Sequence, residues 1–119
     1  MVVKVLGVFK AATDLRAYAP GEVVFEAGSQ GQEMFGVAEG MVELRFPDGR
    51  VSQVGPDETF GELAIIDSSP RAATAVALED SQLAVIDKRR FLFLVHETPQ
   101  FALQVMSSLA ERLRSSTGS

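Results

Sequence analysis

Short apolar runs separated by turn signals fill the chain as far as residue 87 and most constrain its fold. We expect strands over 23–25, 34–38, 41–46, 51–54, 74–78 and 82–87. Glycine, proline and polar residues interrupt them at Pro20-Gly21, Gly28 to Gln32, Glu39-Gly40, Pro47 to Arg50 and Gly55 to Glu58. Many short strands at close intervals are typical of a closed or rolled antiparallel sheet.

The strongest turn signal is Pro47-Asp48-Gly49-Arg50, because Asp-Gly suits the positive φ angles of a tight hairpin. It predicts that 41–46 and 51–54 pair with each other. In the same way, we expect 74–78 and 82–87 to form a pair across Glu79-Asp80-Ser81.

Helical patterns frame this predicted sheet. Residues 2–12 have apolar side chains at helical spacing, and Asp87 is placed to cap a helix that ends before Thr98-Pro99. A last amphipathic helix follows to about Arg114, with Phe101, Val105, Leu109 and Leu113 at spacing four and Met106 beside them. The predicted fold is mainly β: an antiparallel β-roll or jelly roll with a short N-terminal helix and two C-terminal helices.

Length and composition fit one compact domain over residues 1–119. Its parts are a helical segment at about 1–13, a roll at about 14–87, helices at about 88–114 and a tail at 115–119. Apolar residues make up 46% of the chain, so it should fold. No cysteine is present and no run of about 18 apolar residues occurs, so we expect neither disulfides nor a membrane span, and a cytoplasmic location.

The charge balance disfavours nucleic acid as a partner. The formal net charge is −5, and an acidic chain repels phosphate backbones. We also expect no helix-turn-helix, since few residues follow the last predicted helix. The single histidine, His96, stands near a helix end and makes a metal site improbable. Phe91, Phe93 and Phe101 are interpreted as core residues.

Residues 60–77, FGELAIIDSSPRAATAVA, carry the strongest functional signal. Gly61 can open a one-turn helix whose amide groups attract an anion. Arg71 adds a planar, permanently charged donor for the same anion. Glu62 can accept a hydrogen bond from a neutral hydroxyl. Together these groups suit a ligand with a phosphate and a vicinal hydroxyl, which is a nucleotide sugar.

This run, Phe60 to Ile65 and then Arg71 to Ala77, resembles the phosphate-binding cassette of cyclic nucleotide-binding domains. Such domains occur in catabolite-type regulators, protein kinase A regulatory subunits and cyclic-nucleotide-gated channels. A second stretch from Gly21 to Gly40 is also similar, although Ser29 and Gly36 depart from the family pattern. The resemblance covers roughly residues 10–114.

The resemblance implies a role for each site residue. Arg71 would neutralise the cyclic phosphate, with the amides of Ala64 and Ala72 and contacts from Ala73. Glu62 and the backbone of Gly61 would hold the ribose 2′-hydroxyl. Apolar contacts and the cover over the base are assigned to Leu63, Val51, Val54, Leu109, Arg112 and Leu113. Domains that favour cGMP often have threonine after the phosphate arginine; here Ala72 predicts cAMP over cGMP.

Plainer interpretations stand beside these. Arg71 alone could be a solvated loop charge, Glu62 could merely favour a helix start, and Thr74 could donate its hydroxyl or face the sheet. No catalytic residue is predicted, because no nucleophile elbow accompanies Ser68, Ser69 and His96. The leading hypothesis is a non-catalytic sensor that binds cyclic nucleotide without a cofactor and signals through its last helices to a homodimer partner or effector protein. The alternative is an interaction module that binds no nucleotide.

Overall fold

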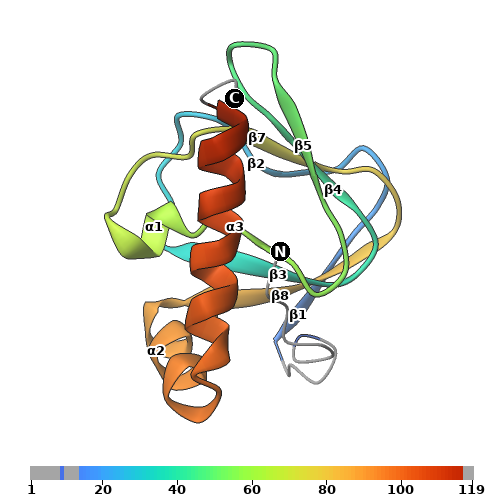
Figure 1. The fold of residues 1–119 in the computed structure, drawn as a ribbon. Coiled ribbons are helices and arrows are strands. Elements are labelled where there is room, and N and C mark those ends of the chain that lie inside the picture. Colours follow the sequence, from blue (N-terminus) through green and yellow to red (C-terminus); the bar gives the residue numbers. More distant parts are fainter. Residues whose placement is uncertain (1–8, 10–13, 117–119) are drawn as a thin grey trace.

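The computed structural model describes Phe9 and residues 14–116, in which two antiparallel sheets form a roll and helices cover one side (Figure 1). The strands are β1 Leu15–Tyr18, β2 Val23–Phe25, β3 Glu33–Glu39, β4 Val42–Arg45, β5 Val51–Val54, β6 Thr59–Phe60, β7 Thr74–Ala77 and β8 Ser81–Asp87. The helices are α1 Leu63–Ile66, α2 Lys88–Glu97 and α3 Gln100–Ser116. Apart from Phe9, the helix expected over 2–12 lies outside the described residues, as does most of the expected tail.

The two sheets have four strands each, in the orders β1-β8-β3-β6 and β2-β7-β4-β5. Every pairing is antiparallel, and the hairpin from β4 to β5 pairs Val42 with Val54 and Arg45 with Val51. The predicted fold class, an antiparallel β-roll with C-terminal helices, is confirmed. Two strands, β1 and β6, were missed by the sequence analysis.

The expected pairing of 74–78 with 82–87 is wrong. β7 pairs with β2 and β4, whereas β8 pairs with β1 and β3 in the other sheet. The burial of β8 gives the reason: Leu83 and Val85 face the core between the sheets, and Ala84 and Ile86 face the helices. A strand with an apolar run must be covered on both faces, and only the sheet beneath the helices offers that.

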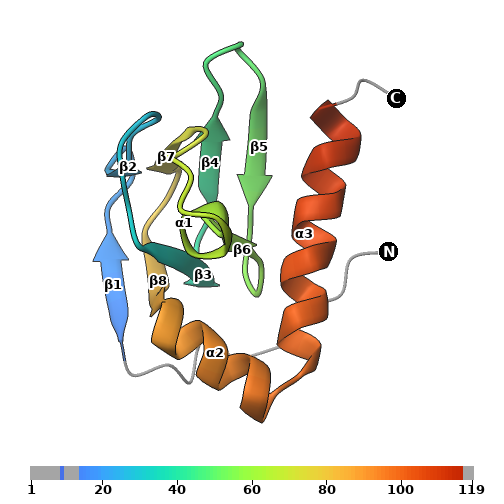
Figure 2. The ribbon, with the colours of Figure 1, turned by 90° about the vertical axis from the view of Figure 1, so that its left-hand side faces the viewer.

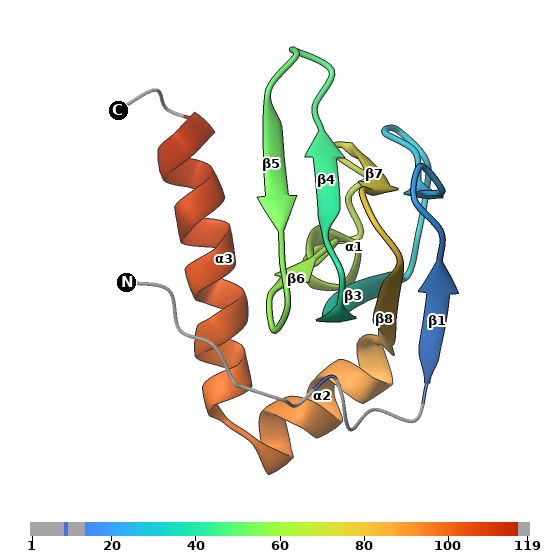
Figure 3. The same ribbon diagram turned by 90° about the vertical axis from the view of Figure 1, so that its right-hand side faces the viewer.

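A second core cluster joins the helices to the outer face of the β1-β8-β3-β6 sheet. Its buried members are Phe9, Met34, Ala38, Ala84, Ile86, Phe101 and Val105. α2 begins where the Asp87 side chain accepts a hydrogen bond from the Arg90 amide (2.8 Å), as the sequence predicts. α3 then runs upward beside the roll, from α2 to the level of the β4–β5 hairpin (Figures 2 and 3).

Not every apolar side chain of the helices joins this core. Phe101 and Val105 are buried, and Phe91 is half-buried, but Phe93 is 54% exposed, so its assignment to the core was wrong. Met106 and Leu113 of α3 are also exposed. Among the described helices, none combines the length and the hydropathy needed for a membrane crossing.

Candidate functional site

The site begins at the turn between β6 and α1. Gly61 has φ +80°, a conformation that side chains disfavour, and this lets the chain reverse directly into the one-turn helix α1. A Cβ at position 61 would also lie 2.9 Å from Nη1 of Arg71. Glycine is therefore required here for both backbone geometry and space.

Arg71 lies in a nearly closed seat and is only 8% exposed. Its Nη1 donates to the carbonyl oxygen of Gly61 (3.2 Å), and its guanidinium lies 4.2 Å from the ring centroid of Phe25. Burial lowers the pKa of Arg71, and the Glu33 carboxylate opposes this shift. The guanidinium stays charged, since its ordinary pKa is far above neutrality. Arg71 is thus a desolvated cation, which interacts more strongly with an anion than a solvated one does.

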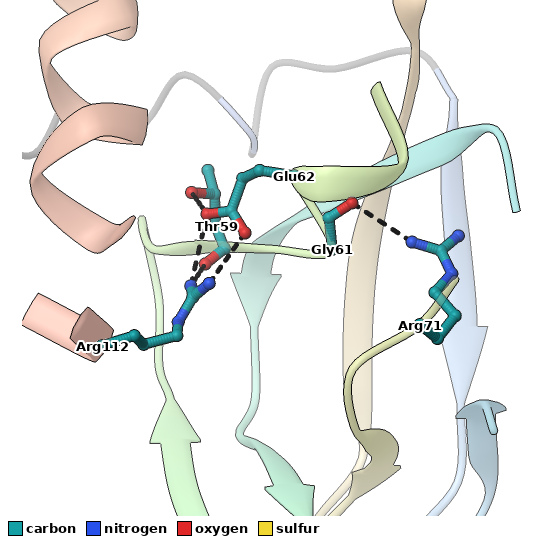
Figure 4. Close-up of polar contacts among 5 residues, drawn as sticks. All are labelled: Thr59, Gly61, Glu62, Arg71 and Arg112. Atoms are coloured by element: carbon teal, nitrogen blue, oxygen red, sulfur yellow. Dashed lines mark hydrogen bonds and ion pairs between the residues drawn. The ribbon is translucent and has the colours of Figure 1, made fainter. Parts of the chain in front are cut away.

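Glu62 is 1% exposed and belongs to a polar cluster beneath α3. Its Oε1 accepts from Nη1 of Arg112 (2.8 Å), and its Oε2 accepts from the Thr59 hydroxyl (2.9 Å) and from Nη2 of Arg112 (3.2 Å). Arg112 also donates to the carbonyl oxygen of Thr59 (2.6 Å). Figure 4 shows this cluster on one side of Gly61 and Arg71 on the other.

One cavity of about 630 Å³ joins the two groups. Its walls include every residue assigned to the phosphate and ribose, together with Leu63: the set is Gly61, Glu62, Leu63, Ala64, Arg71, Ala72 and Ala73. Leu109, Arg112 and Leu113 of α3 line it as well. Its volume falls within the range of about 300–1,000 Å³ typical of small-molecule sites. Arg71 and Glu62, the two charged residues singled out in the sequence, therefore both line one cavity.

Val51 and Val54, assigned to the base, lie elsewhere. Both line a separate groove between β5 and α3, where Val51 is 61% exposed and Val54 is buried in the core between the sheets. The alternation of β5 explains why one is exposed and the other buried, because side chains three residues apart on a strand point to opposite faces of the sheet. Of the residues assigned to apolar contacts and to the base, the structure brings Leu63 and the three residues of α3 to the cavity.

Several residues around the cavity were not assigned to it from the sequence. Phe25 forms the aromatic seat of Arg71, and Gly31 leaves room for the guanidinium, since a Cβ there would meet it at 2.3 Å. The glycine-rich turn Gly28 to Gln32 was visible as a signal but had no assigned partner. Phe46, Asp48 and Arg50 of the β4–β5 hairpin also line the cavity.

Two backbone details refine the expected anion cradle. The Ala64 amide donates to the carbonyl oxygen of Gly61 over a long 3.4 Å, so this donor is only weakly engaged. Ala72 is exposed beside Arg71 at the cavity wall. Thr74 is not among the residues that line the cavity; its hydroxyl accepts a hydrogen bond from the Ala27 amide (3.0 Å) in the turn before Gly28.

Comparison with known proteins gives the family. The model of the cyclic nucleotide-binding domain matches residues 15–98, well over half of the chain. The chain belongs to this family. The resemblance inferred from the cassette is confirmed, and the matched range contains the whole roll from β1 to β8.

Relatives of this cyclic nucleotide-binding domain include regulators. The cyclic AMP receptor protein of Thermus thermophilus is 35% identical over 104 residues, 83% of this chain and 48% of the receptor. The cAMP-dependent protein kinase regulatory subunit of Candida albicans is 32% identical over 115 residues, 88% of this chain and 25% of the subunit. The chain thus spans about half the length of the receptor and a quarter of the subunit.

A solved structure is also similar. It comes from work on a cyclic-GMP-dependent signalling pathway that regulates bacterial phytopathogenesis, and it superimposes with a TM-score of 0.73 at 33% identity, covering 84% of each chain.

Within Phe9 and residues 14–116, histidine and carboxylate side chains do not gather into a group of three that could hold a metal ion.

Proposed function

We propose that this domain is a non-catalytic sensor that binds a cyclic nucleotide in the cavity between the cassette and α3. The observation that carries the proposal is the presence of Arg71 and Glu62 on one cavity of about 630 Å³. A cyclic nucleotide needs one cation for its phosphate and one acceptor for its ribose hydroxyl, and this cavity offers both.

Arg71 is the proposed phosphate ligand. The hydrogen bond that Arg71 donates to the Gly61 carbonyl oxygen uses Nη1, and the guanidinium has further N–H donors for a phosphate. A guanidinium offers five N–H donors in a planar fork that matches phosphate oxygens. The ring of Phe25 fixes the plane of this fork before the anion arrives, which limits the entropy lost on binding.

Glu62 is the proposed ribose ligand. A carboxylate has about four acceptor positions, and Thr59 and Arg112 occupy three of those on Glu62. A ribose 2′-hydroxyl can take the remaining position or displace one Arg112 contact. The nucleotide would then change the link between the cassette and α3, and so bias the position of that helix.

We further propose that cAMP is preferred over cGMP. Ala72 follows Arg71 at the cavity wall and has no hydroxyl to donate to, or accept from, a guanine edge. The cAMP receptor and the cAMP-dependent kinase subunit among the relatives support this choice. The similar structure from a cyclic-GMP pathway means that both nucleotides must be compared directly.

Isothermal titration calorimetry with cAMP and cGMP tests the proposal. We expect cAMP to bind the native chain more tightly, Arg71→Ala to abolish measurable binding and Glu62→Gln to weaken it. Arg45→Ala is a matched control, since Arg45 pairs with Glu43 on β4 and does not line the cavity. Heats that are unchanged in Arg71→Ala would overturn the assigned phosphate site. Native protein that binds neither nucleotide would favour the interaction-module alternative.

The readout is proposed to pass through α3 to a second copy of the chain or to an effector protein. Leu103, Met106 and Leu113 are exposed along the helix, and with Ala110 they follow the alternating three- and four-residue spacing of a coiled-coil seam. Light scattering at increasing concentration checks the dimer version. A monomeric mass with and without cAMP would exclude it and leave the effector.

A further inference from the structure

Phe9 packs in the apolar cluster beneath the C-terminal helices. It is 1% exposed, and its ring meets that of Phe101 on α3 edge-on, with centroids 6.2 Å apart. Phe101 in turn meets Phe91 of α2 at 5.7 Å. Three aromatic rings thus form a continuous row from residue 9 through the base of α3 to α2.

Gly36 makes room for the first ring of this row. It lies at the centre of β3, between Met34 and Ala38, whose side chains are buried beneath the helices. A Cβ at position 36 would lie 2.4–2.6 Å from three carbon atoms of the Phe9 ring. The φ of Gly36 is not among the positive values, so its backbone does not require glycine. Space for Phe9 therefore explains why this strand carries a glycine.

We propose that Phe9 and Gly36 form a lock that positions α3 over the nucleotide cavity. The lower part of α3 contacts this lock through Phe101, and the upper part supplies Leu109 and Arg112 to the cavity wall. Phe9 acts through α3 and does not touch the cavity, so it is a positioning residue. The effect on ligand affinity rests on the proposed function; the effect on α3 does not.

The lock sets the fraction of molecules whose cavity is complete. When Phe9 is seated, α3 is held at its base, and Leu109 and Arg112 lie at the cavity wall. When Phe9 leaves, Phe101 loses a ring contact and the helix has a gap beneath it. Apparent affinity falls in proportion to the fraction of molecules in the binding-competent state. By linkage, a bound nucleotide must also favour the seated Phe9.

Hydrogen exchange and calorimetry on the full chain test the lock with the variants Phe9→Ala, Phe9→Leu and Gly36→Ala. Without ligand, we expect Phe9→Ala and Gly36→Ala to speed amide exchange in α3 but not in β4 and β5. Both should lower the affinity for cAMP by about tenfold or more, in line with a shift of population away from the competent state. Phe9→Leu, which keeps much of the apolar volume, should show smaller changes in the same direction.

Two controls separate the lock from general destabilisation. Leu83→Ala removes a fully buried side chain from the core between the sheets, and it should lower the melting temperature without changing α3 exchange or affinity. Adding Gly36→Ala to Phe9→Ala should cost nothing further, since the added methyl then meets no ring. Additive losses, native α3 exchange in Gly36→Ala, or an equal affinity loss in Leu83→Ala would each overturn the lock. If the native chain binds no nucleotide, the proposed function fails and the exchange data still decide the lock.

Discussion

The two ends of α3 are attached to the roll by different chemistry. At the base, Phe101 and Val105 are buried with Phe9, Met34 and Ile86 in an apolar cluster. At the upper end, Leu113 is 65% exposed, and Arg112 makes the main attachment through Glu62 and Thr59. The base of α3 is therefore held by the burial of apolar surface, whereas its upper end is held by a few directional hydrogen bonds and an ion pair.

This difference shows which part of the helix a ligand can move. A small polar ligand cannot replace the apolar contacts at the base, because it has no matching apolar surface. The Arg112–Glu62 ion pair, in contrast, uses the same carboxylate that we propose for the ribose hydroxyl. We therefore expect the upper end of α3 to respond to the nucleotide while the base stays in place as a pivot.

The largest effect should come from truncating the base. Phe101 is fully buried and contacts two other rings, so Phe101→Ala should lower the free energy of unfolding by about 3–5 kcal/mol. The matched change at the other end, Leu113→Ala, should stay within about 0.5 kcal/mol because that side chain is exposed. Urea unfolding of both variants measures the contrast. Similar losses at the two ends would contradict it.

The polar attachment should give an intermediate effect. Arg112→Met leaves the buried Glu62 carboxylate without its cation and should cost about 2–3 kcal/mol, somewhat less than a fully buried pair because Arg112 is partly exposed. In the double variant Glu62→Gln with Arg112→Met, most of this loss should be recovered, since no charge is left unpaired. A double-mutant cycle by urea unfolding at pH 7 checks both values. A loss below about 0.5 kcal/mol in Arg112→Met would show that the pair does not hold the helix.

The smallest effect concerns a polar contact at the base, between Gln104 and the turn before β6. Gln104 is 1% exposed, and its side chain donates to the carbonyl oxygen of Asp57 in the turn before β6. Gln104→Ala should lower the free energy of unfolding by about 1–2 kcal/mol, because it removes this bond to a partly buried carbonyl. Gln100→Ala, at an exposed position of the same helix, is the control. A loss for Gln104→Ala larger than that for Phe101→Ala would reverse the comparison.

Much of the roll and the helices followed from local patterns. The Asp48-Gly49 turn, the Asp87 cap and the break at Thr98-Pro99 each depend on neighbouring residues, and the structure shows all three. Pairing of β7 and β8 could not be read in this way, because sheet membership depends on what covers each face. After a short turn, a strand in a roll can join either of the two sheets. β8 joins the β1-β8-β3-β6 sheet because its apolar side chains are buried on both of its faces there.

The site was predictable where its residues are close in sequence. Gly61, Glu62 and Arg71 belong to one cassette, and they border one cavity. The contacts that set their environment are distant: Arg112 is 50 residues from Glu62, and the seat of Arg71 comes from Phe25 and Gly31. Gly36 was read as a departure from the family pattern in a strand, and its reason is the ring of Phe9. No local pattern contains such pairings.

A crystal structure of the domain with cAMP tests the central claim most directly. We predict the cyclic phosphate within hydrogen-bond distance of the Arg71 guanidinium and the ribose 2′-hydroxyl on Glu62, with the Arg112 contacts lengthened or broken and Phe101 still seated against Phe9. A nucleotide bound outside the cavity, with Arg71 still donating only to Gly61 and Glu62 still closed by Arg112 and Thr59, would contradict the account.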